Sequence, residues 1–296
     1  MVDKLFFFIA KFYAFLYFYT KKFSGIRISG LGFILRLIRK PQIINYKNKK
    51  LYISPKVISS YGISIINKSQ EKETEDFLDK IMDGLKGYKK KVNFIDVGSN
   101  IGIFLLKMSS YRNINFLIGF EPSIEAVEAA SKTLELNNFN KFKIFNNLVG
   151  SNNKKTYYSN DIDPQRASVY SAKKSKKKIL LKEIRLDDNK AIKKLSIDDY
   201  SVMLIDVEGY EPNVINGGLN FIKNNKPLII FEYNYLSKKY YSINQIYSLL
   251  GEGWEILRLR NDSLLDYDVE NTWNCIAIHK KSVYSKLFKN LGLYFI

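Results

Sequence analysis

The sequence contains one cysteine, Cys275, and one histidine, His279, among its 296 residues. A single cysteine can form neither a disulfide framework nor a thiolate cage for a metal ion, so we expect a reducing, cytoplasmic setting. A lone histidine at the end of an apolar run is more often structural or exposed than catalytic, and we assign it no role as a base. No internal repeat is visible.

Long apolar runs are also missing, although a helix needs about 20 apolar residues to span a bilayer. The run from Leu5 to Tyr19 is interrupted by Lys11, and no small-residue cleavage site follows it, so we expect neither a membrane span nor a signal peptide. A ring-rich helix flanked by basic residues is typical of a helix that lies in the plane of a membrane surface. The alternative is a helix that packs against the domain.

Acidic residues are scarce at both ends of the sequence. Residues 1–50 carry eleven lysines or arginines and one acid, and residues 280–296 carry four lysines and no acid, within a net charge of +18. A nucleic-acid enzyme more often spreads basic surface over its catalytic face, so we expect no nucleic-acid partner. We expect residues 1–40 to associate with the inner face of the cytoplasmic membrane.

These patterns divide the chain into a basic, aromatic-rich appendage (1–50), a main domain (51–279) and a basic amphipathic tail (280–296) that we place beside the appendage. Residues 51–66 alternate in polarity and predict a small hairpin. Two polar, lysine-laden stretches in 151–185 predict an inserted hairpin and loop. Within them, residues 173–178 are most simply a solvated loop.

Short apolar runs alternate with helical stretches in the main domain. Strands are predicted at 92–97, 116–120, 142–145, 202–207 and 228–231, and helices at 69–85, 101–109, 123–138, 212–223 and 243–250. This alternation predicts an α/β fold with a doubly wound, Rossmann-like, mostly parallel sheet of seven strands, plus an N-terminal helical appendage. The runs at 254–259 and 273–279 would close the sheet as an antiparallel pair.

Two motifs point to a cofactor with a ribose. The run FIDVGSNIG, from Phe94 to Gly102, reads as a strand, a glycine turn and a helix, with Asp96 where the strand ends. In GFEPS, Glu121 ends the next strand at about the distance where an acid reaches a ribose diol. The loop reads G-x-N-x-G and lacks the third glycine of a pyrophosphate-binding loop, so a cofactor without phosphate suits it better.

A third motif crowds acids at two further strand ends. Asp206, Glu208 and Glu211 follow one predicted strand, and Glu232 ends the next. Clustered carboxylates are unfavourable unless they bind a cation, hydrogen-bond a ligand or share protons. We predict no metal site, but a divalent cation that acidifies a hydroxyl is an open alternative.

FIDVGSNIG, GFEPS, and IDVEGYE followed by IIFEYN lie between Val92 and Asn234 and resemble, in order and spacing, successive blocks of the FkbM family of methyltransferases. The resemblance implies the class I fold and S-adenosylmethionine as cofactor. It also implies methylation of a hydroxyl, often on a sugar of a surface glycan, glycolipid or secondary metabolite. Leu204 departs from the family pattern, which usually has lysine at this position.

The resemblance also implies a set of site residues around the three motifs. The cofactor pocket is expected to comprise Asp96, Gly98, Ser99, Asn100, Gly102, Glu121, Pro122, Ser123, Asn147 and Asp206. Asp206, Glu208 and Glu211 are the candidate catalytic residues, and the first two could take the proton of the acceptor hydroxyl. Glu232 and Tyr210 are the candidate substrate-binding residues, with Tyr233 and Tyr235 nearby.

Three other functions stay open from the sequence alone. A nucleotide-dependent oxidoreductase uses a similar sheet, but the glycine loop disfavours it. An RNA methyltransferase finds support only in the net charge, and the asparagine-proline-proline-tyrosine motif of amino methylation is absent. A membrane-bound binding protein with a decayed site is opposed by the intact Asp96, Glu121 and Asp206. The sequence leaves the oligomeric state undetermined.

Overall fold

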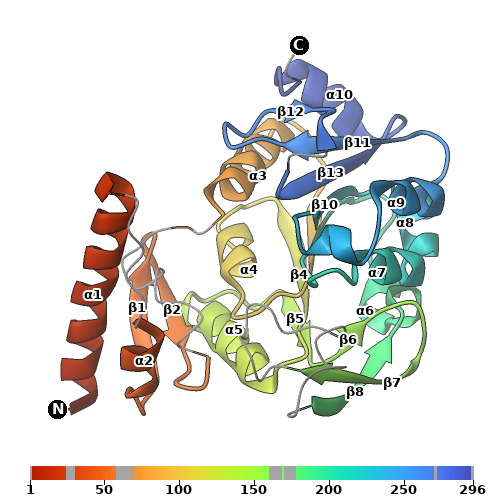
Figure 1. Cartoon of the computed structure of the whole chain (residues 1–296). Helices are drawn as coiled ribbons and strands as arrows, with labels where there is room; N and C mark the ends of the chain where they lie inside the picture. Colours follow the sequence, from red (N-terminus) through yellow and green to blue (C-terminus); the bar gives the residue numbers. More distant parts are fainter. Residues whose placement is uncertain are drawn as a thin grey trace.

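The computed structural model describes residues 2–24, 31–57, 69, 71–159, 169, 178–269 and 272–294, and an eight-stranded sheet lies at its centre (Figure 1). The strand order is β12-β11-β13-β10-β9-β3-β4-β5. Following the chain, the strands are β3 (Val92–Val97), β4 (Ile114–Phe120), β5 (Phe142–Phe145), β9 (Tyr200–Ile205), β10 (Leu228–Glu232), β11 (Trp254–Leu259), β12 (Leu265–Asp266) and β13 (Asn274–His279).

Five neighbouring strands of the sheet, β10, β9, β3, β4 and β5, are parallel to one another. Strand β13 runs antiparallel to both β10 and β11. The predicted doubly wound, mostly parallel fold and the antiparallel pair of β11 and β13 are therefore confirmed. The sheet has eight strands rather than seven, because Leu265–Asp266 adds β12 at one edge. Two residues are too few to produce a periodic sequence signal.

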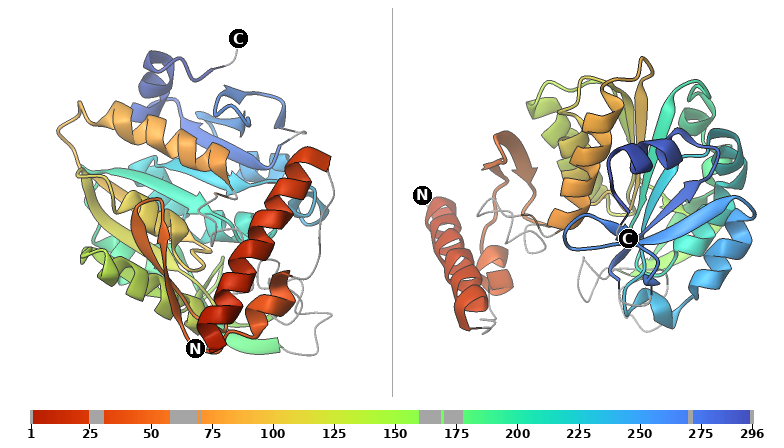
Figure 2. Two further views of the ribbon diagram at one scale, coloured as in Figure 1. Left: turned by 90° about the vertical axis from the view of Figure 1, so that its left-hand side faces the viewer. Right: turned by 90° about the horizontal axis from the view of Figure 1, so that it is seen from above.

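Helices cover both faces of the sheet (Figures 1 and 2). Successive side chains of a strand point to opposite faces, so Phe94 packs in one apolar cluster and its neighbour Ile95 in another. The cluster around Phe94 contains residues of α3 (Lys72–Leu85), α4 (Ile103–Met108), α5 (Ile124–Leu136) and α10 (Val283–Asn290). The cluster around Ile95 contains residues of α6 (Lys190–Lys193), α7 (Glu211–Gly217), α8 (Leu219–Asn225) and α9 (Ile243–Leu250).

The helix predicted at 212–223 is divided into α7 and α8 near Gly217 and Gly218. A β-carbon at Gly217 would lie 2.0 Å from the carbonyl oxygen of Gly150, so the two backbones approach too closely for any side chain. Two short 3₁₀ helices, η5 (Leu186–Asp188) and η6 (Ser237–Lys239), complete this side.

The predicted insertion in 151–185 contains a hairpin, as expected. Strands β7 (Lys154–Ser159) and β8 (Lys178–Ile184) are antiparallel, and β8 also pairs with β6 (Leu148–Val149). Most of the lysine-rich stretch 173–178 lies outside the described residues.

At the N-terminal side, α1 (Val2–Ser24) and α2 (Leu31–Arg36) lead into a hairpin of β1 (Gln42–Tyr46) and β2 (Lys49–Ile53). The hairpin predicted at 51–66 is thus corrected, because its strands lie earlier and residues 58–66 fall outside the described part of the chain. It is fixed to α5 by the Tyr52 amide, which donates to Thr133 Oγ1 over 3.0 Å.

The expected position of the C-terminal segment is wrong. Helix α10 packs on α3 and the sheet, where the Phe288 ring meets that of Phe77 with centroids 5.7 Å apart. The Tyr284 hydroxyl donates to the carbonyl oxygen of Ser201 over 2.8 Å. These buried rings place α10 in the core of the domain, at the opposite end of the structure from the start of α1 (Figure 1).

Candidate active site

The carboxyl ends of β3, β4 and β9 are tied together by backbone hydrogen bonds. The Gly98 amide donates to the Phe120 carbonyl and the Asp206 amide to the Val97 carbonyl, both over 2.9 Å. Gly98 has φ +89°, and a β-carbon there would lie 1.9 Å from the Asp206 carbonyl oxygen. Only glycine fits this turn, so the first motif brings β3 and β9 into direct contact.

Glu121 is held at this edge by two backbone amides. Its Oε2 accepts from the Asn100 amide over 2.9 Å, and its Oε1 accepts from the Ser123 amide over 2.8 Å. Burial raises the pKa of Glu121 to about 7, although these two hydrogen bonds act in the opposite direction. Each carboxylate oxygen keeps lone-pair capacity for a further donor, such as a ligand hydroxyl.

Asp96 is almost completely buried at the end of β3. Its side chain is 2% exposed, and its Oδ2 atom has no hydrogen-bond partner among the described residues. Burial first, and then the nearby carboxylate of Asp206, raise the pKa of Asp96 well above its usual value. An unpaired buried oxygen of this kind is stabilised by a donor or a cation brought by a ligand.

The turn after β9 presents Asp206 and Glu208 and buries Glu211. Glu208 has φ +53°, a left-handed conformation that only a small fraction of non-glycine residues adopt. Glu211 is fully buried, and its Oε1 accepts from the amides of Val207 and Gly209 over 3.1 and 3.2 Å. Glu211 therefore holds the turn that presents the other two acids.

Glu232, at the end of β10, adds a third carboxylate to this edge. Burial, followed by the charges of Asp206 and Glu208, raises the pKa of Glu232 to about 11. Burial raises the pKa of Asp206 itself to about 6. One carboxylate oxygen from each of these three acids lies within 4.8 Å of the others, an arrangement that could hold a divalent cation.

Two cavities open at the carboxyl ends of the strands. Cavity A, of about 210 Å³, lies over β3, β4 and the turn after β5, and its lining includes Lys56, Glu121, Pro122, Ser123, Asn147, Tyr158 and Tyr210. Cavity B, of about 580 Å³, lies between the hairpin, α3 and the loop after β10, and its lining includes Tyr46, Glu71, Ser99, Glu232, Tyr235 and Trp273. Gly98, Asn100, Asp206 and Glu208 line both cavities.

The structure thus brings together most of the predicted site residues, and their roles stay predictions. Five positions differ from the sequence-based grouping. Ser99 lines cavity B rather than A, and Tyr210 lines cavity A, away from Glu232. Gly102 lines neither cavity and instead caps α4, where a β-carbon would lie 2.8 Å from that of Ala130. Asp96 and Glu211 also line neither cavity.

His279 also lies outside both cavities, on β13. Its ring packs edge-on against Trp254, with centroids 5.4 Å apart, and its Nδ1 accepts from the Lys281 amide over 3.0 Å. These contacts agree with the structural role expected from the sequence.

Several lining residues carry no sequence motif. Tyr46 reaches cavity B from the hairpin, Glu71 precedes α3, and Trp273 precedes β13. Burial, followed by the charge of Asp206, raises the pKa of Glu71 to about 8, which ties it electrostatically to the acidic edge. The acids that open the 69–85 helix were the one available signal for Glu71, whereas no local pattern marks Tyr46 or Trp273.

Comparison of the sequence with models of protein families finds a match to one family. The sequence matches the Methyltransferase FkbM domain over residues 96–261. No curated protein matches the sequence.

Solved structures with some similarity include methyltransferase FkbM from Methylobacillus flagellatus KT, with 14% identity and a TM-score of 0.42, covering 76% of this chain and 54% of that one. This chain therefore spans about half the length of that protein. A ribosomal protein L11 methylase from Lactobacillus delbrueckii subsp. bulgaricus has 17% identity, a TM-score of 0.39, and coverage of 70% and 79%. TYW2 from M. jannaschii, in complex with AdoMet, has 10% identity, a TM-score of 0.39, and coverage of 87% and 90%.

Proposed function

The chain belongs to the FkbM methyltransferase family, and from this premise we propose that it transfers the methyl group of S-adenosylmethionine to a hydroxyl oxygen of a sugar-containing acceptor. One observation carries the proposal: two cavities meet at Asp206 and Glu208. Methyl transfer is an in-line displacement, so donor and acceptor must approach each other from opposite sides of such a junction.

The residues around cavity A fit the proposed donor. S-adenosylmethionine supplies a methyl group on a positively charged sulfur and also carries a cationic amino group and a ribose. Asp96 does not line the cavity, but it ends β3 beside Asp206, and a cationic group bound at this edge would stabilise its charge. Glu121, fixed by two amides, would accept hydrogen bonds from the ribose hydroxyls, and Asn147 would lie on the adenine side.

The charge of cavity A disfavours a dinucleotide. Glu121, Asp206 and Glu208 line it, and its basic side chain, Lys56, pairs with Glu125 over 3.2 Å. A pyrophosphate placed beside these carboxylates would be repelled. This supports a methyltransferase rather than the nucleotide-dependent oxidoreductase that the sequence left open.

Cavity B has the composition of a site for a neutral, hydroxyl-rich acceptor. Among the described residues that line it, six are acidic and none is basic, which disfavours phosphorylated acceptors and RNA. The rings of Tyr235 and Trp273 lie 6.4 Å apart at its wall and could pack against a sugar. Its volume falls in the range of small-molecule sites.

A sugar hydroxyl must lose its proton as its oxygen attacks, so a base is needed at the junction. We assign this role to Glu208, because it lines both cavities and one of its carboxylate oxygens lies within 4.8 Å of carboxylate oxygens of Asp206 and Glu232. Asp206 lies beside it, and its pKa of about 6 leaves it largely ionised at neutral pH, so it can orient the hydroxyl or the donor. Glu211 positions the turn.

The test uses the full chain with methyl-labelled S-adenosylmethionine and a panel of neutral and phosphorylated oligosaccharides. We expect Glu208→Gln to lower turnover about 10²- to 10⁴-fold, the contribution of a general base, while leaving donor affinity by calorimetry within about 3-fold. Glu252→Gln, the same change at an exposed position, should behave like the unmodified protein.

Each contrary outcome has a separate meaning. Absence of donor binding would overturn the proposed function, whereas unchanged turnover in Glu208→Gln would remove only the assigned base. Loss of turnover with a chelator, restored by Mg²⁺, would show that Asp206, Glu208 and Glu232 act through a cation. Labelling of RNA, weakened steeply by salt, would support the RNA alternative.

A further inference from the structure

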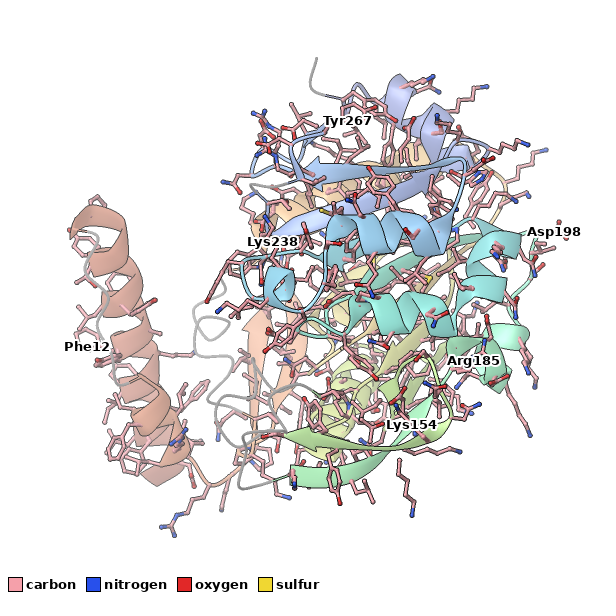
Figure 3. All side chains as sticks on the ribbon, turned by 45° about the vertical axis from the view of Figure 1, so that its right-hand side comes forward. Phe12, Lys154, Arg185, Asp198, Lys238 and Tyr267 are labelled. Atoms are coloured by element: carbon pink, nitrogen blue, oxygen red, sulfur yellow. The ribbon has the colours of Figure 1, made fainter. Side chains whose placement is uncertain are left out.

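Helix α1 exposes a continuous apolar stripe to solvent. Its members recur at intervals of three and four residues, which places them on one face of a helix, and between 39% and 69% of each is exposed: Leu5, Phe8, Ile9, Phe12, Phe15, Tyr19 and Phe23. Among the side chains of α1 that the structure describes, no charged one lies within the stripe. Figure 3 shows Phe12 on the side of α1 that faces away from the rest of the chain.

The opposite face of α1 is already used by the chain itself. Ala10 and Ala14 are 0% and 1% exposed, and Ala10 packs in a cluster with Leu35 and Ile38. The small side chains allow close approach of α2, while the hairpin lies between these helices and the domain (Figure 2). The orientation of α1 is therefore fixed by packing, and the stripe must face outward.

The surroundings of the stripe are basic. Lys4 and Lys11 are exposed on α1, and Arg36, Arg39 and Lys40 are exposed at the end of α2 and in the turn that follows it. The one acid of residues 1–50, Asp3, accepts a hydrogen bond from the Arg39 amide over 2.7 Å, so it joins the start of α1 to the end of α2. An apolar stripe with cations beside it is complementary to a lipid bilayer, which has an apolar interior and, when its head groups are anionic, a negatively charged surface.

We propose that α1 lies in the plane of an anionic phospholipid bilayer, with the stripe buried at the level of the head groups. Scattered exposed apolar residues are ordinary, but a contiguous row of seven on one helix marks an interaction surface. No helix among the described residues is long and apolar enough to cross a membrane. Rings on one face with lysines beside them are the features of an interfacial helix.

The same face could in principle be covered by a second copy of the chain, but the charges favour lipid. A second copy would bring the same exposed cations against one another, whereas anionic head groups would neutralise them. Each lysine or arginine near such a surface adds about 1 kcal/mol to binding.

The experiment is flotation of the full chain with two kinds of vesicle. One contains phosphatidylcholine alone, and the other also contains about 30 mol% of the anionic lipid phosphatidylglycerol. We expect flotation with the anionic vesicles and at least about 10-fold weaker binding for the triple variant Phe8→Ser, Phe12→Ser and Phe15→Ser. The matched control replaces exposed rings of the main domain, Tyr157→Ser and Tyr267→Ser, and should float like the unmodified chain; Tyr267 lies far from α1 (Figure 3).

Two further variants separate the apolar and ionic contributions. Lys4→Glu with Lys11→Glu should weaken binding to anionic vesicles and leave the weak binding to neutral ones unchanged. Phe12→Trp should shift its fluorescence to shorter wavelength when the same anionic vesicles are added. Equal flotation with and without phosphatidylglycerol, or no flotation at all, would overturn the proposal.

Light scattering without vesicles tests the competing occupant. A dimer that the triple variant breaks, together with absence of vesicle binding, would show that a second copy covers the stripe. The membrane proposal and the proposed function are tested separately. If the triple variant loses vesicle binding but retains turnover on a soluble acceptor, the assigned active site is unaffected.

Discussion

Replacing Gly98 by alanine should distort the point where the two cavities meet. The new β-carbon would lie 1.9 Å from the Asp206 carbonyl oxygen, and φ at this position is +89°. The conformational strain is worth about 1–3 kcal/mol, and forcing the β3–α4 turn away from β9 adds about 1–3 kcal/mol. We therefore expect Gly98→Ala to lower the free energy of unfolding by roughly 2–6 kcal/mol and to weaken donor binding.

Two other glycines separate the cost of the positive φ from the cost of the steric contact with Asp206. Gly251 has φ +80°, but no atom of the described residues lies within 4 Å of the position that a β-carbon would take, so Gly251→Ala should show the conformational strain alone. Gly87 has open space and no positive φ, so Gly87→Ala should change stability little. Urea denaturation and calorimetric titration with S-adenosylmethionine measure both effects. If Gly98→Ala were as stable as Gly251→Ala and bound the donor normally, the close contact between the turn and Asp206 would be refuted.

Two more predictions concern the acids and the rings. Burial raises the pKa of Glu211 from 4.5 to about 8, so its protonated form is favoured in the folded state and stability should fall as pH rises from about 5 to 8, by at most about 1.4 kcal/mol per pH unit. Urea midpoints of Glu211→Gln should decline less over that range; an identical decline would show that other groups are responsible. Trp273→Ala should raise the acceptor KM about 2- to 10-fold without changing donor affinity, with Tyr267→Ala as the control; weaker donor binding would place the ring in the wrong cavity.

Much of the fold followed from local patterns. The strand at Val92–Val97 and the helix at Ile243–Leu250 coincide with the ranges predicted from apolar periodicity. The short strand β12 and the correct first strand of the hairpin, β1, were not recognised. Their pairing depends on partners elsewhere in the chain, and two to five residues carry too little periodicity to reveal it.

The sequence predicts the position of those site residues that lie at the carboxyl ends of parallel strands. Asp96, Glu121 and Asp206 lie at the carboxyl ends of adjacent parallel strands, which share one edge of any such sheet. Trp273 and Tyr46 arrive at cavity B from remote segments, so only the packed structure identifies them. Glu211 was grouped with its neighbours because spacing cannot show that a side chain turns back to hydrogen-bond its own loop.

The position of β13 has a consequence for synthesis. This strand lies between β10 and β11, so the sheet is discontinuous until residues near 279 have left the ribosome. Contacts across so long a stretch of chain form slowly. A nascent polypeptide that already contains all three sequence motifs would still lack the wall of cavity B beside Trp273, and catalytic competence should appear only after β13 inserts.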